Sequence, residues 1–198
     1  MKRPPLLKKF KIPDNAKQVF KGLHFSTYQW EQKLYDDSFK TFEGIKRKDT
    51  AIVIPVIGEE VVLVKEIQPH WPEAMTTLIA GGVEDEETLE EGAKREVREE
   101  TGLVFEDFYL VRADNMANGI DWKIYTFVAK NLKETKEKML DAGEQNEILK
   151  VSFEEMIRMA KEMKLGHRPR LIEEHILGDK IETLYELLRH PEKYQIRY

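Results

Sequence analysis

The stretch from Gly81 to Leu103, GGVEDEETLEEGAKREVREETGL, constrains the fold more than any other part of the chain. It begins with a Gly-Gly pair that favours a turn, and it continues through an acidic loop. A helical composition follows from about Thr88 to Thr101. Gly102 then occupies the position at which glycine commonly ends a helix. The stretch therefore predicts a loop, a helix and an abrupt stop.

One face of this predicted helix carries three carboxylates. Glu96 and Glu100 are four residues apart, and Glu99 is three residues from Glu96, so the three are neighbours on the helix surface. Like charges at this spacing repel each other, and a helix that keeps them together needs a cation to offset them. Hard divalent ions such as Mg²⁺ take carboxylate oxygens and leave room for substrate phosphates. The alternative is an ordinary solvated face of Glu, Lys and Arg.

The whole stretch resembles the Nudix box, the signature of Mg²⁺-dependent hydrolases of nucleoside diphosphates linked to another moiety. A chance match of its fixed Gly, Glu and Arg positions is on the order of 10⁻⁵ over a chain of this length. A solvated helix face does not explain why the glycines also fall at box positions. The matching residues are Gly81, Glu87, Arg95, Glu96, Val97, Arg98, Glu99, Glu100, Thr101, Gly102 and Leu103.

The resemblance implies a metal site. Glu96 and Glu100 are expected to be the principal ligands of Mg²⁺, with Mn²⁺ as the alternative ion. Glu99 is expected to be a further ligand or to orient the attacking water. The backbone carbonyl of Ala80 is expected to complete the protein ligands.

The resemblance also assigns the groups around the metal. Arg95 is expected to pair with Glu87 and hold the box loop, so that the glutamates keep their orientation. In the ADP-ribose branch of the family, a glutamate in a loop after the box assists the water. Glu144 is the first choice for this base and Glu147 the second. The alternative is that this acidic loop is simply solvated.

Three further residues are candidates for substrate binding. Arg47 and Glu43 resemble positions where that branch uses an arginine near the substrate diphosphate, and arginine can bind phosphate through two donors. The alternative for Arg47 is a surface pair with Asp49. Trp71 offers an indole on which a purine can stack, or it packs beneath its loop.

The pattern of elements predicts an α/β fold. Strands on both sides of the box helix fit the α/β/α sandwich with a mixed sheet that the resemblance implies. Strands are expected at 51–57, 61–67, 105–112, 123–129 and 148–151. A polar loop is expected over 113–121. Ser152 and Glu155 form a capping box that begins a helix, in which Met156, Met159 and Met163 are expected to be core residues. Two more helices are expected at about 170–177 and 181–188.

The N-terminal part differs from the rest in composition. Residues 1–48 are expected to form a lead-in and a small antiparallel β-sheet rich in aromatic residues, and residues 49–198 the hydrolase domain with its C-terminal helices. So small a sheet cannot bury all of its aromatic side chains. In the ADP-ribose branch a similar sheet packs against a partner subunit, so the resemblance implies a homodimer. The alternative is a cap folded onto its own domain.

The charge and composition of the chain indicate which kinds of molecule it is expected to bind. The net charge is −5 with both signs interspersed, which does not favour nucleic acid or an anionic membrane as the main partner. Cysteine is absent, and the five histidines have no metal-ligand spacing. No apolar run is long enough to span a bilayer. We expect a cytoplasmic protein whose partner is a small nucleotide.

The expected activity is Mg²⁺-dependent cleavage of a pyrophosphate bond, with ADP-ribose or an ADP-sugar as first choice and a nucleoside monophosphate as product. Alternative substrates are NADH, dinucleoside polyphosphates and oxidised nucleoside triphosphates, and a non-catalytic ligand sensor is the alternative of another class. Two departures bear on the substrate. The segment from Thr77 to Gly81 replaces the common Glu-Leu-Pro-Ala-Gly, and Ala117 or Asn118 replaces the proline of that branch.

Overall fold

The computed structural model describes residues 10–68, 71–139, 145–166 and 169–197. It divides the chain into two compact units. The N-terminal unit comprises residues 1–49 and 114–124, and the C-terminal unit comprises residues 50–113 and 125–198. The sequence-based division at residue 48 remains a prediction about domains.

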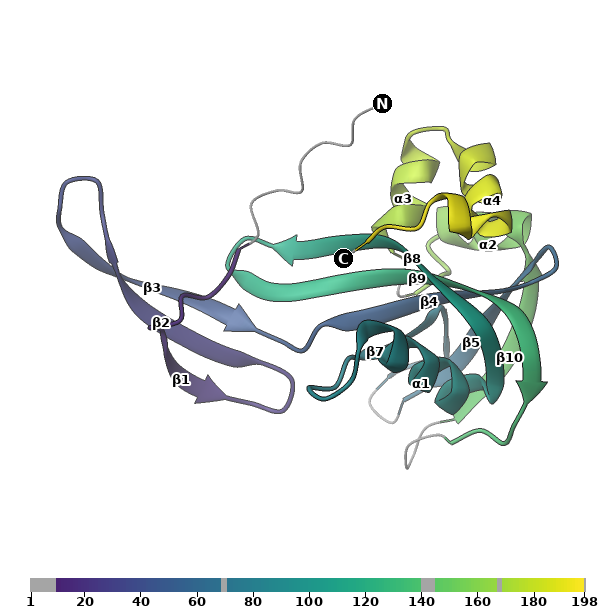
Figure 1. The fold of residues 1–198 in the computed structure, drawn as a ribbon, viewed down its shortest axis with the longest axis horizontal. Helices are drawn as coiled ribbons and strands as arrows, with labels where there is room; N and C mark the ends of the chain where they lie inside the picture. Colours follow the sequence, from purple (N-terminus) through teal and green to yellow (C-terminus); the bar gives the residue numbers. More distant parts are fainter. Residues whose placement is uncertain (1–9, 69–70, 140–144, 167–168, 198) are drawn as a thin grey trace. The chain divides into compact units, whose positions relative to one another are not determined.

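The N-terminal unit is a small sheet of three antiparallel strands in sequential order: β1 (Lys17–Lys21), β2 (Ser26–Lys33) and β3 (Phe39–Lys46) (Figure 1). Its β2–β3 turn is closed by Asp36, whose carboxylate accepts hydrogen bonds from the N–H and the hydroxyl of Ser38. The end of β3 pairs in parallel with the start of strand β9 at Ile45 and Ile120. The predicted antiparallel N-terminal sheet is confirmed.

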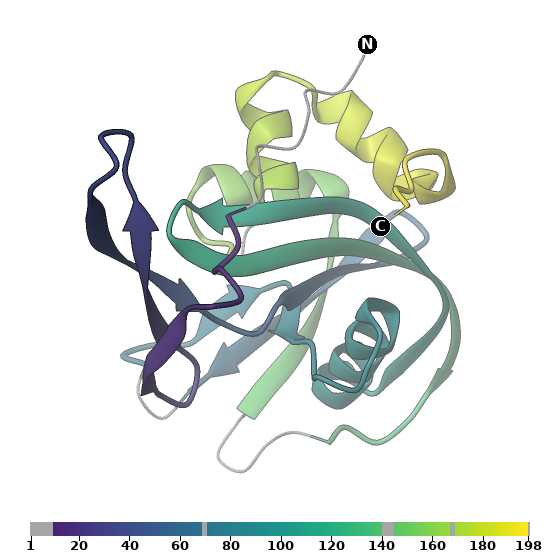
Figure 2. The same ribbon diagram turned by 60° about the vertical axis from the view of Figure 1, so that its left-hand side comes forward.

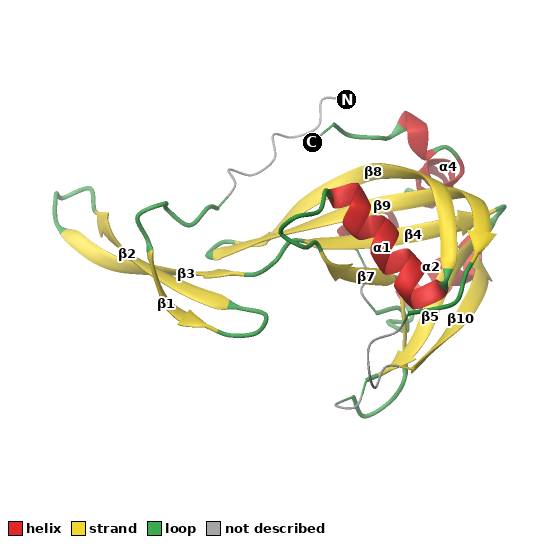
Figure 3. Cartoon of the chain, turned by 60° about the horizontal axis from the view of Figure 1, so that its bottom comes forward, coloured by secondary structure: helices red, strands yellow, loops and turns green. Residues whose placement is uncertain are grey.

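The C-terminal unit is built on a curled sheet, seen from below in Figure 3. Four strands follow each other in the order β9-β4-β5-β10, while β8 pairs with β9, β7 with β4 and β6 with β5. The strands are β4 (Thr50–Ile57), β5 (Glu60–Ile67), β6 (Met75–Thr77), β7 (Ile79–Gly82), β8 (Leu103–Ala117), β9 (Ile120–Thr135) and β10 (Gln145–Ser152).

The central strands are apolar because both of their faces are covered. Residues 51–56 of β4 and 61–64 of β5 are all buried. Figures 1 and 2 show helix α1 (Leu89–Thr101) on one side of these strands and helices α2 (Phe153–Lys161), α3 (Arg170–Leu177) and α4 (Ile181–Arg189) on the other. A short 3₁₀ turn, η1 (Pro191–Lys193), follows α4. This arrangement confirms the predicted α/β/α sandwich.

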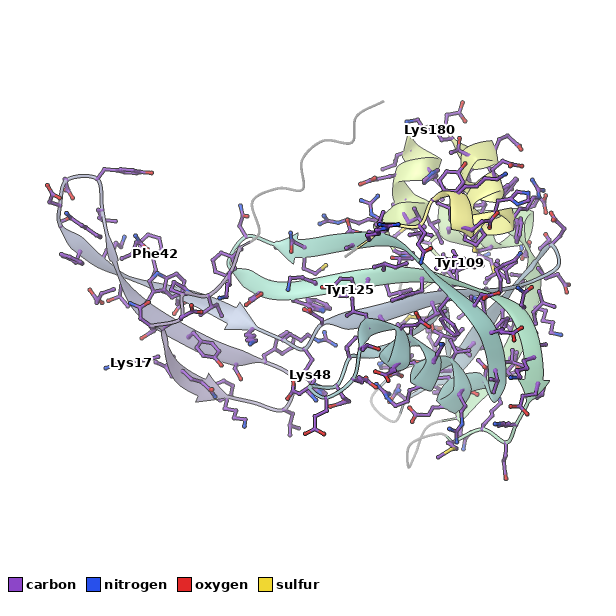
Figure 4. All side chains as sticks on the ribbon, viewed as in Figure 1. Lys17, Phe42, Lys48, Tyr109, Tyr125 and Lys180 are labelled. Atoms are coloured by element: carbon purple, nitrogen blue, oxygen red, sulfur yellow. The ribbon has the colours of Figure 1, made fainter. Side chains whose placement is uncertain are left out.

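Helix α1 packs into the main hydrophobic core through Ala93 and Val97, which lie against β4 and β7. Tyr125, labelled in Figure 4, belongs to the same core and is almost completely buried. Since each buried side chain of this size stabilises the fold by about 1.5–3 kcal/mol, this core fixes the position of α1 firmly.

The ends of α1 follow the signals in the sequence. Thr88 is the N-cap: its hydroxyl accepts the N–H of Glu91, and the Glu91 carboxylate accepts the N–H of Thr88. Gly102 ends the helix with φ of 69°. The capping box at the start of α2 is only half formed. Ser152 accepts the N–H of Glu155, but the Glu155 carboxylate binds Arg158 instead.

Two predictions about local structure are wrong. Residues 113–121 are not a loop, because β8 and β9 form one long hairpin that turns only at Asn118-Gly119. The side chains of this segment are polar, which is typical of loops, but backbone pairing between the two strands determines its conformation. Met163 does not fill the core: α2 ends before it, and the residue is 74% exposed.

None of the helices in the described residues has both the length and the apolar composition that crossing a membrane requires.

The end of α1 generates a prediction. A Cβ at Gly102 would overlap the carbonyl oxygen of Lys136, whereas Gly58, which also has positive φ, has no atom within 4 Å of that position. Gly58→Ala should therefore cost only the left-handed conformation, about 1 kcal/mol. Gly102→Ala should cost about 2–4 kcal/mol, because steric overlap is added. Urea unfolding of both variants measures the difference, and equal losses would contradict this account of Gly102.

Candidate active site

The site is organised by one arginine at the centre of α1. The Nη2 atom of Arg95 donates to Glu87 Oε1 at 2.6 Å and to the carbonyl of Gly82 at 2.8 Å, and its Nε donates to Glu87 Oε2 at 3.1 Å. The Nη1 atom donates to Glu96 Oε1 at 2.6 Å and to Glu99 Oε2 at 3.1 Å. One guanidinium thus joins the loop before α1, the end of β7 and two carboxylates of α1.

The loop end of this network is also fixed. Glu87 Oε1 accepts the N–H of Glu84 at 2.7 Å, and its side chain is only 16% exposed. A Cβ at Gly92 would lie 2.9 Å from Glu87 Oε1, so a glycine within the helix leaves room for this carboxylate. Sequence reasoning missed Gly92, although a glycine inside a good helix is a signal of close packing.

The carboxylate of Glu96 lies directly over the backbone of β7. A Cβ at Gly81 would overlap all three atoms of that carboxylate. The side chain of Glu96 is 14% exposed. Gly81 follows Ala80 in β7, so the structure brings Glu96 beside the strand whose Ala80 carbonyl is a candidate ligand.

The electrostatics of the site leave negative charge incompletely compensated. Burial raises the pKa of the Glu96 carboxyl, and the opposing effect of Arg95 is smaller. Hydrogen bonding to Glu87, above all, raises the pKa of Arg95. Arg95, the positive partner of Glu96, also binds Glu87, Glu99 and the carbonyl of Gly82, so its single charge is shared. Ionised Glu96 therefore needs further positive charge nearby.

The donor set fits a hard divalent cation. Carboxylates of Glu96, Glu99 and Glu100 occupy neighbouring positions of α1, the Oε2 atom of Glu100 is buried, and glycine leaves space at β7. In the described part of the chain, no three acidic or histidine side chains converge closely enough to hold an ion in this conformation. Glu96 and Glu99 are directed toward Arg95 instead.

The C-terminal turn of α1 is held from a distant part of the chain. The carbonyl of Glu99 accepts the N–H of Met139 at 3.0 Å, and the carbonyl of Glu100 accepts Asn146 Nδ2 at 2.8 Å. Lys138 in turn binds Asn146. Sequence reasoning missed Lys138 and Asn146, because nothing in the local sequence indicates a partner 46 residues away.

Of the two candidates for the general base, Glu147 belongs to the described residues and Glu144 does not. The prediction that Glu147 lies in a loop is wrong, because β10 begins at Gln145. Glu147 is exposed on this strand and pairs in register with Lys65 of β5. Glu144 lies outside the described residues. Trp71 is half-buried, and its backbone N–H donates to the carbonyl of Gln68 at 2.9 Å.

Two candidate substrate-binding residues belong to the N-terminal unit. The guanidinium carbon of Arg47 lies 4.4 Å from the centre of the Trp122 ring and 5.3 Å from that of Phe25. Asp49, the alternative partner of Arg47, binds the N–H and the ammonium group of Lys123 instead. Glu43 is exposed and accepts a long hydrogen bond, 3.4 Å, from Gln29 on β2.

Comparisons with known proteins agree with this fold and site. The NUDIX domain family matches residues 46–173, well over half of the chain. The chain is 26% identical over 147 residues to an ADP-ribose pyrophosphatase of Bacillus subtilis (strain 168), covering 73% of this chain and 80% of that protein. A crystal structure of an ADP compounds hydrolase has the same fold, with a TM-score of 0.64 at 17% identity, covering 89% of this chain and 92% of that chain.

The chain therefore belongs to the Nudix family. It is a Nudix hydrolase, and enzymes of this family generally use divalent metal ions.

The close contact at β7 generates a prediction. Gly81→Ala should displace the Glu96 carboxylate and lower hydrolase activity by about 100-fold, the upper range for disturbing a metal site. Gly82→Ala is the matched control, because a Cβ there has no atom within 4 Å, and its loss should be far smaller. Steady-state rates at saturating metal measure both. Similar losses in the two variants would show that the Gly81–Glu96 contact does not matter.

Proposed function

We propose that this Nudix hydrolase cleaves the pyrophosphate bond of ADP-ribose or an ADP-sugar with Mg²⁺, releasing AMP. Mn²⁺ is the alternative ion. The observation that carries the proposal is the carboxylate face of α1, packed against Gly81 and organised by Arg95. The named activity of the Bacillus subtilis relative supports this choice of substrate class.

The residues of α1 and β7 would hold the metal. Glu96 and Glu100 are the principal ligands in this proposal, with Glu99 and the carbonyl of Ala80 beside them. Divalent ions bound there neutralise the charge that accumulates on phosphate oxygens during hydrolysis. Arg95 does not act on the substrate. It positions Glu96 and Glu99 through one hydrogen bond to each, and Glu87 fixes Arg95 through two more.

Glu144 remains our proposal for the residue that accepts the proton of the attacking water, by resemblance to the ADP-ribose branch. Glu147 is the second choice. It lies opposite Lys65 in the β5–β10 pair, so a cation is its cross-strand neighbour. The matched variants Glu144→Gln and Glu147→Gln separate the two.

Arg47 is proposed to bind a substrate phosphate. Its guanidinium lies over the rings of Trp122 and Phe25, and these contacts restrict the side chain. A guanidinium can donate two parallel hydrogen bonds to phosphate oxygens. Glu43 on β3 and Trp71 after β5 are proposed as further substrate contacts, Trp71 through stacking on the base.

The substrate proposal is tested by AMP release. Purified enzyme with Mg²⁺ is incubated with ADP-ribose, ADP-glucose, NADH, diadenosine polyphosphates and nucleoside triphosphates in parallel. We expect the highest kcat/KM with ADP-ribose or ADP-glucose, and loss of activity in EDTA. Preference for NADH, a dinucleoside polyphosphate or a nucleoside triphosphate would contradict the proposed substrate, and binding without turnover would identify a sensor.

The metal ligands generate a separate prediction. Glu100→Gln should lower kcat by at least about 100-fold and leave the unfolding temperature unchanged or higher, because it removes one charge from a repelling cluster. Glu90→Gln is the control on the same helix: Glu90 is exposed and pairs with Lys94. It should keep nearly full activity. Normal turnover by Glu100→Gln at limiting Mg²⁺ would exclude Glu100 as a ligand.

We also propose that the N-terminal sheet forms a homodimer. Large apolar side chains of its strands and connecting segments are exposed, and a three-stranded sheet alone cannot bury them. In solution, light scattering should give twice the chain mass of 23.3 kDa, and Phe20→Lys should give the monomer. A monomeric parent protein would contradict the proposal. The exposed residues are Val19, Phe20, Leu23, Phe25, Tyr35, Phe39, Phe42 and Ile45.

A further inference from the structure

The last turn of α1 carries two candidate metal ligands and is capped from outside the helix. The final carbonyl groups of a helix have no partner within it. In α1, the carbonyls of Glu99 and Glu100 are satisfied by Met139 and by the side chain of Asn146. A third contact joins the same segments, because Lys136 N–H donates to the carbonyl of Gly102 at 2.7 Å.

Asn146 is itself held in one orientation. It lies on β10 and pairs in register with Glu66 of β5. Lys138 Nζ donates to Asn146 Oδ1 at 2.8 Å and to its backbone carbonyl at 3.3 Å. Because the amide has one donor end and one acceptor end, only this orientation satisfies both Lys138 and the carbonyl of Glu100. The ammonium group also lies near the negative end of the helix, where a cation is favourable.

We propose that Asn146, oriented by Lys138, is a positioning residue for the metal-binding carboxylates of α1. Its hydrogen bond restrains the backbone of Glu100, and the carboxylate of Glu100 follows that backbone. The inference rests on the proposed function, since it requires that Glu100 binds a divalent ion. Neither residue touches the metal or the substrate; both act through the geometry of the last turn.

The test is the affinity of the whole protein for Mn²⁺, measured by isothermal titration calorimetry without substrate. Asn146→Asp keeps the shape of the side chain but presents an oxygen to the carbonyl of Glu100. It also adds a negative charge, which would by itself strengthen cation binding. We expect Mn²⁺ affinity to fall by about 10-fold, a typical effect of disturbing a group that orients a ligand. A loss of Mn²⁺ affinity despite the added negative charge would therefore show that the geometry of the last turn has changed.

Two further variants separate positioning from stability. Lys138→Met leaves the bond between Asn146 and Glu100 in place but removes the group that orients the amide, so we expect a smaller loss of Mn²⁺ affinity. Arg112→Met breaks the bidentate ion pair between β8 and Glu174 of α3, with bonds of 2.7 and 2.8 Å. It should lower the unfolding temperature. Its Mn²⁺ affinity should stay within about 2-fold of that of the parent protein, because distant sites act almost independently.

The measurements distinguish a failure of the positioning role of Asn146 from a failure of the proposed hydrolase function. If the parent protein binds Mn²⁺ and releases AMP, but Asn146→Asp and Lys138→Met bind Mn²⁺ as the parent does, the positioning role is wrong and the proposed function stands. Should Asn146→Asp fail to fold, Lys138→Met decides. A parent protein that neither binds Mn²⁺ nor hydrolyses ADP-ribose would overturn both.

Discussion

The hydrogen-bonded contact between Arg95 and Glu87 is the interaction on which the site depends. Alone it would be an ordinary ion pair of modest value. Here the same guanidinium also binds the carbonyl of Gly82 and two carboxylates of α1, so a loop, a strand and a helix share one rigid cation. The glycines of the stretch follow from this constraint, because Gly92 leaves room for Glu87 and Gly81 leaves room for Glu96.

The site also holds more negative than positive charge, and this imbalance favours the binding of a cation. Burial disfavours the charged form of Glu96, and one arginine cannot neutralise several carboxylates. A divalent cation held by these carboxylates would relieve both effects at once, and such ions leave room for substrate phosphates. The hydrophobic core beneath α1 and the external cap on its last turn keep the carboxylates together despite their repulsion.

Sequence reasoning was accurate where the signals are local. The extent of helix α1, its stop at Gly102 and the pair of Arg95 with Glu87 follow from residues close in sequence or from a fixed motif. It failed where partners are distant. Nothing local indicates that Asn146 caps α1, and the polarity of residues 113–121 concealed a hairpin whose backbone pairing determines its structure.

A crystal structure grown with Mn²⁺, with anomalous diffraction to locate the ion, tests the central claim most directly. The account predicts an anomalous peak within coordination distance, about 2.0–2.6 Å, of Glu96, Glu100 and the carbonyl of Ala80. It also predicts that Arg95 still binds Glu87 when the ion is bound. A peak away from α1, or an ion bound with the Arg95–Glu87 contact broken, would contradict the claim that Arg95 organises a metal site.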